Sequence, residues 1–98
     1  MRFFISFTPT ATASLKELKE SPHLAKRFKA VSKALMLLQE NPRHPGLQTH
    51  EFYSFRGPHG EKVFKAYAEQ DTSAAYRIFF FYGKQRGEIV IVAITPHP

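Results

Sequence analysis

Two apolar runs near the end of the chain constrain its fold more than any other feature. The segments "AAYRIFFFY" (74–82) and "GEIVIVAIT" (87–95) are rich in β-branched and aromatic residues, and only the turn residues "GKQRG" (83–87) separate them. Such composition is typical of strands, and a connection this short joins antiparallel neighbours. The two runs therefore predict a β-hairpin.

Shorter runs upstream predict further strands. "EFYSF" (51–55) and "KVFKAYA" (62–68) lie on either side of "RGPHG", a segment rich in glycine and proline, which predicts a second hairpin. At the start of the chain, "RFFISF" (2–7) has the composition of one more strand.

Two helices are expected between the first strand and the hairpins. Thr8-Pro9 is an N-cap residue followed by proline at the first helical position, and the helix that it opens ends near Glu20. Ser21-Pro22 repeats this signal and opens a second helix, which ends near Asn41 because a proline follows. The second helix has a single apolar stripe, formed by Leu24, Phe28, Val31, Leu35 and Leu38.

These elements predict one domain over residues 1–98, of the α+β class. The expected order is β-α-α-β-β-β, with one further short strand left open. Two N-terminal helices would pack on one face of a curled antiparallel sheet, giving two layers. The turn signals do not decide whether the last strand lies beside the first.

Both faces of the last hairpin are apolar, although an antiparallel sheet with one solvated face normally alternates. Strict alternation separates Tyr76, Ile78, Phe80 and Tyr82 from Arg77, Phe79 and Phe81 in the first run, and Ile89, Ile91 and Ala93 from Val90, Val92 and Ile94 in the second. Two helices can cover only one face. Either a partner segment or a second copy covers the other, or the sheet curls and its own loops fill the concave side.

Composition limits the kinds of partner and chemistry. The net charge of +6 favours a polyanionic partner, either nucleic acid or an acidic protein segment. There is no Cys, the five histidines lack the spacing of zinc motifs, and no cofactor motif is present, so we expect neither metal nor cofactor. No segment resembles a signal peptide or a membrane span, which predicts a soluble protein of the cytoplasm.

The few polar residues that interrupt the apolar strands have the chemistry of RNA cleavage. Arg77 and Lys65 lie within strands, and His97 follows the last strand between two prolines. Attack by a 2′-hydroxyl on the adjacent phosphate requires proton transfer at two oxygens and cations beside the phosphate, and these residue types supply both. In a suitable register His97 would approach Arg77. His50 and Glu69 are further acid or base candidates.

Each of these residues also has a structural interpretation. An arginine in an apolar strand is commonly ion-paired or extended towards solvent, and the other side chains are commonly solvated. The same choice applies to a basic set along the second helix and the loop after it, which either follows an RNA backbone or is only a solvated surface. This set consists of Lys26, Lys29, Lys33, Arg43 and His44.

Taken together, these features resemble the RelE/ParE superfamily of bacterial type II toxins over nearly the whole chain. The resemblance rests on the order of several pieces: a short first strand, a helical hairpin containing "LKELKES" and "AKRFKAVSKALMLLQENPR", the "HPGLQTH" loop, "YRIFFFY" with an arginine after an aromatic residue, and a last strand ending in a histidine.

The resemblance implies a toxin that an antitoxin holds inactive with a wrapping, often acidic, segment, in a hetero-oligomer or alongside a homodimer. Many members are ribosome-dependent endoribonucleases that cut mRNA without metal. In such a member Arg77 would bind the phosphate and His97 would transfer a proton, while Lys65 and His50 match only the region of the other basic and acid–base residues.

The resemblance also implies two alternatives to a ribonuclease. ParE-like members inhibit DNA gyrase without catalysis, and a degenerate member would be a non-toxic binding module. Whether this chain is an enzyme is therefore left open.

Overall fold

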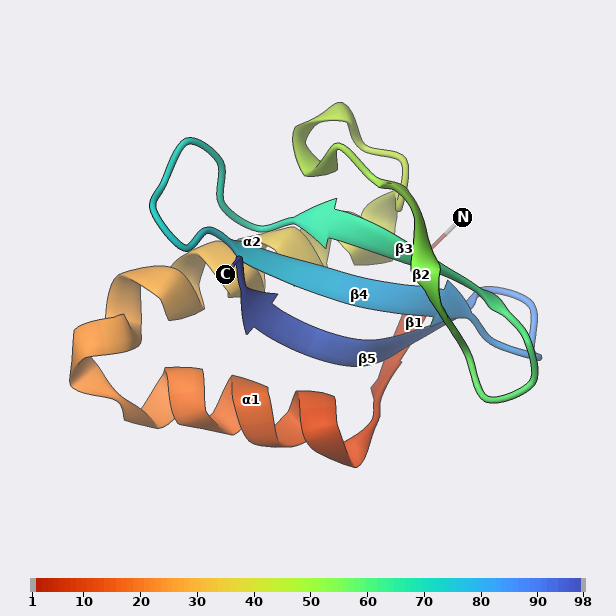
Figure 1. The fold of residues 1–98 in the computed structure, drawn as a ribbon, viewed down its shortest axis with the longest axis horizontal. Coiled ribbons are helices and arrows are strands. Elements are labelled where there is room, and N and C mark those ends of the chain that lie inside the picture. The colour runs from red at the N-terminus through yellow and green to blue at the C-terminus, as the bar shows by residue number, and fades with distance from the viewer. Residues whose placement is uncertain (1, 98) are drawn as a thin grey trace.

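The computed structural model describes residues 2–97 and consists of two helices packed on a five-stranded sheet (Figure 1). The elements in chain order are β1 (Phe4–Phe7), α1 (Pro9–Glu20), the 3₁₀ turn η1 (Pro22–Leu24), α2 (Ala25–Glu40), the 3₁₀ turn η2 (Pro45–Leu47), β2 (His50–Arg56), β3 (Lys62–Tyr67), β4 (Tyr76–Tyr82) and β5 (Glu88–Pro96). The two-layer α+β class is confirmed, and the further strand that the sequence left open is present. No helix in the described range is long and apolar enough to cross a bilayer.

Local signals set the helix ends. The Oγ1 of Thr8 accepts a hydrogen bond from the N–H of Ala11 at 3.2 Å and donates one to the carbonyl oxygen of Val92 at 3.2 Å, so the cap also ties α1 to β5. Pro22 opens the turn η1 rather than α2 itself, and α2 begins after that turn. The extended conformation of Asn41, with φ −161° and ψ 103°, ends α2 before the proline that follows.

The sheet has the strand order β1-β5-β4-β3-β2. The strands from β2 to β5 are antiparallel neighbours. The turn signals predicted the pairs β2–β3 and β4–β5, and β3 pairs with β4 across the longer loop 68–75. The last strand does lie beside the first, but β1 and β5 run parallel, with Phe4 opposite Glu88 and Phe7 opposite Ile91. The sheet is therefore mixed rather than antiparallel throughout.

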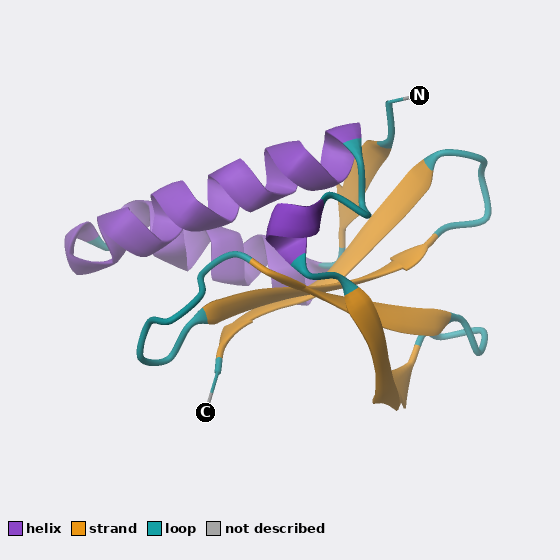
Figure 2. Cartoon of the chain, turned by 90° about the horizontal axis from the view of Figure 1, so that it is seen from above, coloured by secondary structure: helices purple, strands orange, loops and turns teal. Residues whose placement is uncertain are grey.

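Both helices cover one face of the sheet (Figure 2), and the largest group of buried side chains lies between the layers. Its members are Ala11, Leu18, Val31, Ala34, Leu38, Leu47, Ala66, Ile78, Phe80, Ile89, Ile91 and Ile94. A bulge interrupts the alternation of β5, because Phe79 pairs with Ala93 whereas Phe80 pairs with Ile91. Ile94 therefore joins the helix-side core and Ala93 packs on the other side, which corrects the strict alternation expected there.

The face that the helices leave uncovered, here called the distal face, is closed in part by the curl of the sheet itself. Phe79 and Phe81 are only 9% and 6% exposed on this face, and they pack with the buried Val63. Phe52 of β2 lies against Phe79 with the ring centroids 5.0 Å apart. Figure 2 shows the strands bending away from the helices on this side. Of the two explanations for the second apolar face, curling accounts for the burial of these side chains.

Candidate functional site

The ladder between β4 and β5 places Arg77 and His97 on the same face. Arg77 lies opposite Thr95, and the backbone N–H of His97 donates to the carbonyl oxygen of Ala75 at 2.8 Å. Since side chains alternate along a strand, Arg77 and His97 both belong to the distal face. Because His97 is two residues beyond Thr95, the partner of Arg77, the two residues are diagonal neighbours across the β4–β5 pair. Residues in this relation lie about 7–8 Å apart. The register therefore brings together the two residues that the sequence analysis paired.

The next two strands add more polar groups at the same end. Lys65 lies opposite Phe79 in the β3–β4 ladder, and His50 lies opposite Lys65 in the β2–β3 ladder. Tyr67, two residues after Lys65, lies opposite Arg77. The polar end of the distal face, as we call this set, consists of His50, Lys65, Tyr67, Arg77 and His97. It adjoins the apolar part of the same face.

Arg77 has a buried donor that no group of the described residues accepts. Its guanidinium carbon lies 5.6 Å from the ring centroid of Phe79, and the residue is half-buried. Within residues 2–97 the buried Nε has no hydrogen-bond partner, and no carboxylate of this range lies within salt-bridge distance of the side chain. An ion-paired structural role, the alternative expected from the sequence, therefore has no partner in this range. A buried donor without a partner is costly, so this nitrogen is a candidate contact for a ligand.

Lys65 is held against aromatic rings rather than extended into solvent. Its Nζ lies 5.6 Å from the ring centroid of Phe52 and 5.5 Å from that of Tyr67. Cation–π contacts of this kind keep an ammonium group on the sheet surface. The ring of Tyr67 also lies 5.8 Å from that of His50, so the three side chains form one cluster. Tyr67 is not among the candidates drawn from the sequence, although alternation along the strand puts it on the same face as Lys65.

The two histidines of the polar end are accessible. Both His50 and His97 are exposed. The Nδ1 of His50 lies 2.9 Å from the carbonyl oxygen of Gln48, so Nδ1 carries the proton in this contact and Nε2 faces away from it. An exposed imidazole whose orientation is set by a backbone carbonyl can exchange protons with a bound substrate.

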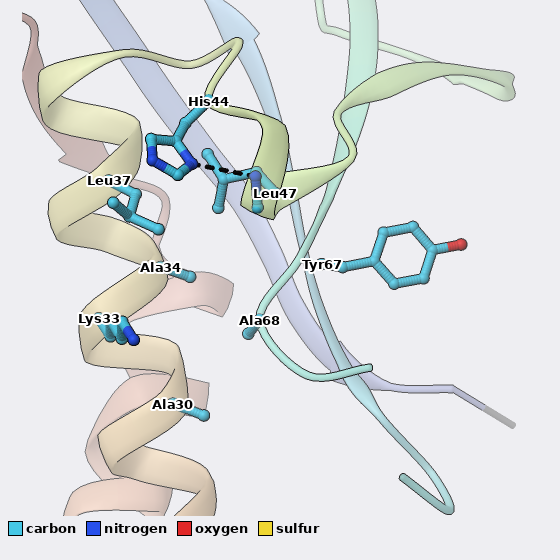
Figure 3. A pocket seen from close by; sticks show the side chains of 9 residues that line it. Ala30, Lys33, Ala34, Leu37, His44, Leu47, Tyr67 and Ala68 are labelled. Atoms are coloured by element: carbon cyan, nitrogen blue, oxygen red, sulfur yellow. Dashed lines mark hydrogen bonds between the residues drawn. The ribbon is translucent and has the colours of Figure 1, made fainter. Parts of the chain in front are cut away.

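The predicted RNA-binding residues lie in the other layer or at its edge. Lys26, Lys29 and Lys33 are exposed on α2, which covers the opposite face of the sheet. Lys33 and His44 line a hollow of about 590 Å³ between α2 and the η2 turn, while the Tyr67 ring points away from it (Figure 3). The Nδ1 of His44 accepts a hydrogen bond from the N–H of Gly46 at 3.0 Å. The structure therefore does not bring these lysines together with Arg77 and His97.

Arg43 lies near His50, a member of the polar end. It lines a hollow of about 330 Å³ together with His50 and Tyr82. Burial raises the pKa of the Tyr82 phenol above its ordinary value, and the positive charge of Arg43 opposes that shift. Thr49 and Phe64 complete the lining of this hollow, which therefore joins Arg43 to His50.

Glu69 is not available as an acid or base. Its Oε1 accepts hydrogen bonds from Nη1 of Arg27 at 2.7 Å and from the N–H of Tyr76 at 3.0 Å, and its side chain is 9% exposed. This carboxylate is a structural anchor, neither solvated nor free to react. Among residues 2–97 no three side chains of the metal-binding types gather in one place.

Comparison with known proteins identifies the fold. No family model and no curated protein matches the sequence. A YoeB dimer from Staphylococcus aureus superposes with a TM-score of 0.70 at 14% identity over 100% of both chains. A YoeB/ParE toxin from Agrobacterium tumefaciens gives 0.70 at 8% identity, again over 100% of both chains. RelE in an archaeal RelE–RelB complex from Pyrococcus horikoshii gives 0.64 at 13% identity over 98% of this chain and 96% of that one. The chain has the fold of the RelE/ParE superfamily, as its sequence resemblance predicts.

Proposed function

We propose that this protein is the toxin of a toxin–antitoxin pair and that it cleaves mRNA on the ribosome. The fold supports the first part, because it is shared with YoeB, ParE-like and RelE proteins. The observation that carries the second part is the polar end of the distal face. There an arginine whose buried Nε has no partner among residues 2–97 lies on the same face as two exposed histidines and a half-buried lysine.

The proposed reaction needs no protein nucleophile. The 2′-oxygen of the RNA forms a bond to phosphorus as its proton passes to a base, and the bond from phosphorus to the 5′-oxygen breaks as an acid donates a proton to that oxygen. The products are a 2′,3′-cyclic phosphate and a 5′-hydroxyl. Arg77 binds the non-bridging oxygens through Nε and its terminal nitrogens, where charge increases in the transition state.

The remaining roles are assigned by the strand on which each residue lies. His97, the diagonal neighbour of Arg77, performs one proton transfer. Lys65 lies on the strand at the other side of Arg77 and adds positive charge beside the phosphate. His50 is one strand further, opposite Lys65, and is the candidate for the second proton transfer. Tyr67 offers a ring on which a base can stack.

The remaining basic residues are assigned to RNA contacts outside the cleavage site. Arg43 extends the path of the RNA past His50 at the β2 edge. Lys26, Lys29 and Lys33 face outwards from α2, and we assign them to ribosomal RNA rather than to the strand being cut. An antitoxin with an acidic segment would bind the polar end and block it. Because the substrate is mRNA on the ribosome, we place the protein in the cytoplasm.

A cell-free translation reaction with mapped mRNA ends tests this proposal. The purified protein is expected to create new mRNA ends within the reading frame, and the same mRNA without ribosomes is expected to remain intact. A parallel DNA gyrase supercoiling assay with the same protein should show no inhibition. Intact mRNA together with inhibited supercoiling would replace the proposal by a non-enzymatic gyrase inhibitor. No effect in either assay would leave a non-toxic binding homologue.

A further inference from the structure

Arg27 joins the helical layer to the loop between β3 and β4. This α2 side chain donates from Nη1 to Oε1 of Glu69 at 2.7 Å and to the carbonyl oxygen of Ala74 at 3.3 Å, and from Nη2 to the carbonyl oxygen of Ser73 at 3.0 Å. Its guanidinium also lies 5.8 Å from the ring centroid of Tyr76. One arginine therefore binds both ends of the loop that precedes β4.

This loop has a backbone that needs support. Asp71 and Ala74 have φ values of 56° and 54°, in the left-handed region that residues with a Cβ seldom adopt. Such conformations persist when surrounding contacts enforce them. Arg27 supplies such a contact, because it donates a hydrogen bond to the carbonyl oxygen of Ala74 itself. The Oε1 of Glu69 accepts a hydrogen bond from the N–H of Tyr76 at 3.0 Å, where β4 begins.

The supported segment leads straight into the polar end of the distal face. The carbonyl oxygen of Ala75, the residue after Ala74, accepts a hydrogen bond from the backbone N–H of His97 at 2.8 Å. Arg77 follows Tyr76, whose N–H is held by Glu69. The same short stretch thus carries the backbone partner of His97 and the beginning of the strand that presents Arg77.

We propose that Arg27 and Glu69 are positioning residues that hold His97 and Arg77 in register from the opposite layer of the molecule. They act through the loop and touch no substrate. The consequence for catalysis rests on the proposed ribonuclease function, whereas the consequence for the backbone at His97 does not. The ion pair is partly buried, with side-chain exposures of 26% for Arg27 and 9% for Glu69, so loss of either partner leaves the other poorly compensated.

Amide hydrogen exchange tests the positioning role without reference to activity. In Arg27→Gln and in Glu69→Gln, exchange at the His97 amide is expected to quicken about tenfold or more, because the loop opens locally. Exchange at Ile78 and Ile94, paired in the middle of the β4–β5 ladder, should stay unchanged. Arg86→Gln, which removes the same charge from an exposed turn residue, should change neither. An unchanged His97 amide, or an equal increase at all three sites, would overturn the proposal.

Cleavage kinetics test the consequence for catalysis. Both variants are expected to lower kcat with little change in KM, since the substrate contacts remain but their geometry loosens. Arg27→Lys keeps the charge without the forked donor and should recover only part of the rate. Faster His97 exchange with an unchanged kcat would overturn the catalytic consequence. If the wild-type protein cleaves no RNA, the proposed function fails, and the exchange result alone decides whether Arg27 and Glu69 position His97.

Discussion

Arg77→Ala is expected to slow mRNA cleavage by about 10²–10³-fold, the loss seen when one preorganised donor to a developing oxyanion is removed. Among residues 2–97 the Arg77 Nε has no hydrogen-bond partner, so the substitution breaks no hydrogen bond in this range, and what the fold loses is the packing of the guanidinium on the Phe79 ring. Circular dichroism and thermal unfolding should show a folded protein. The rate is measured as the appearance of new mRNA ends in the translation reaction.

Two further arginine substitutions sharpen this prediction. Arg77→Lys keeps a positive charge but cannot bind two phosphate oxygens at once, so its rate should lie between those of the wild type and Arg77→Ala. Arg86→Ala removes an exposed arginine from the turn between β4 and β5 and should cleave at the wild-type rate. Wild-type cleavage by Arg77→Ala would remove Arg77 from the catalytic set.

His97→Ala is expected to slow cleavage by about 10²–10⁴-fold, the contribution typical of a general acid or base. The side chain is exposed, and the contact of its backbone N–H with Ala75 remains available to alanine, so the β4–β5 ladder should persist. His23→Ala, at an exposed position in the η1 turn, is the matched control and should keep full activity. Equal rates for His97→Ala and the wild type would exclude the imidazole from the reaction.

Local sequence signals were sufficient for most of the fold. The Thr8 cap sets the start of α1, and the proline after Asn41 sets the end of α2. Both signals could be found in the sequence because each acts within one turn of the chain. The hairpins followed from short, glycine-containing turns. The parallel pairing of β1 with β5 did not follow, because it joins strands separated by nearly the whole chain, and no turn chemistry reports such contacts.

The candidate site could be predicted only as far as alternation along a strand holds. Alternation placed Arg77 on the face of Phe79 and Phe81, and the strand register now adds Lys65, His97 and His50 at the same end of that face. It failed at Ala93 and Ile94, because a bulge changes the face on which each side chain lies and has no sequence signature here. The pairing of Glu69 with Arg27 was also missed, since a contact between a helix and a loop depends on how the layers pack.

The chemical form of the cleaved ends tests the central claim most directly. That claim is that Arg77 and His97, on one face of the sheet, promote attack by the 2′-hydroxyl of the RNA itself. Mass spectrometry of the upstream fragment, taken early in the reaction, should then find a 2′,3′-cyclic phosphate, with a 5′-hydroxyl on the downstream fragment. An upstream 3′-hydroxyl paired with a downstream 5′-phosphate would mean that water attacked the phosphorus, and it would contradict the mechanism.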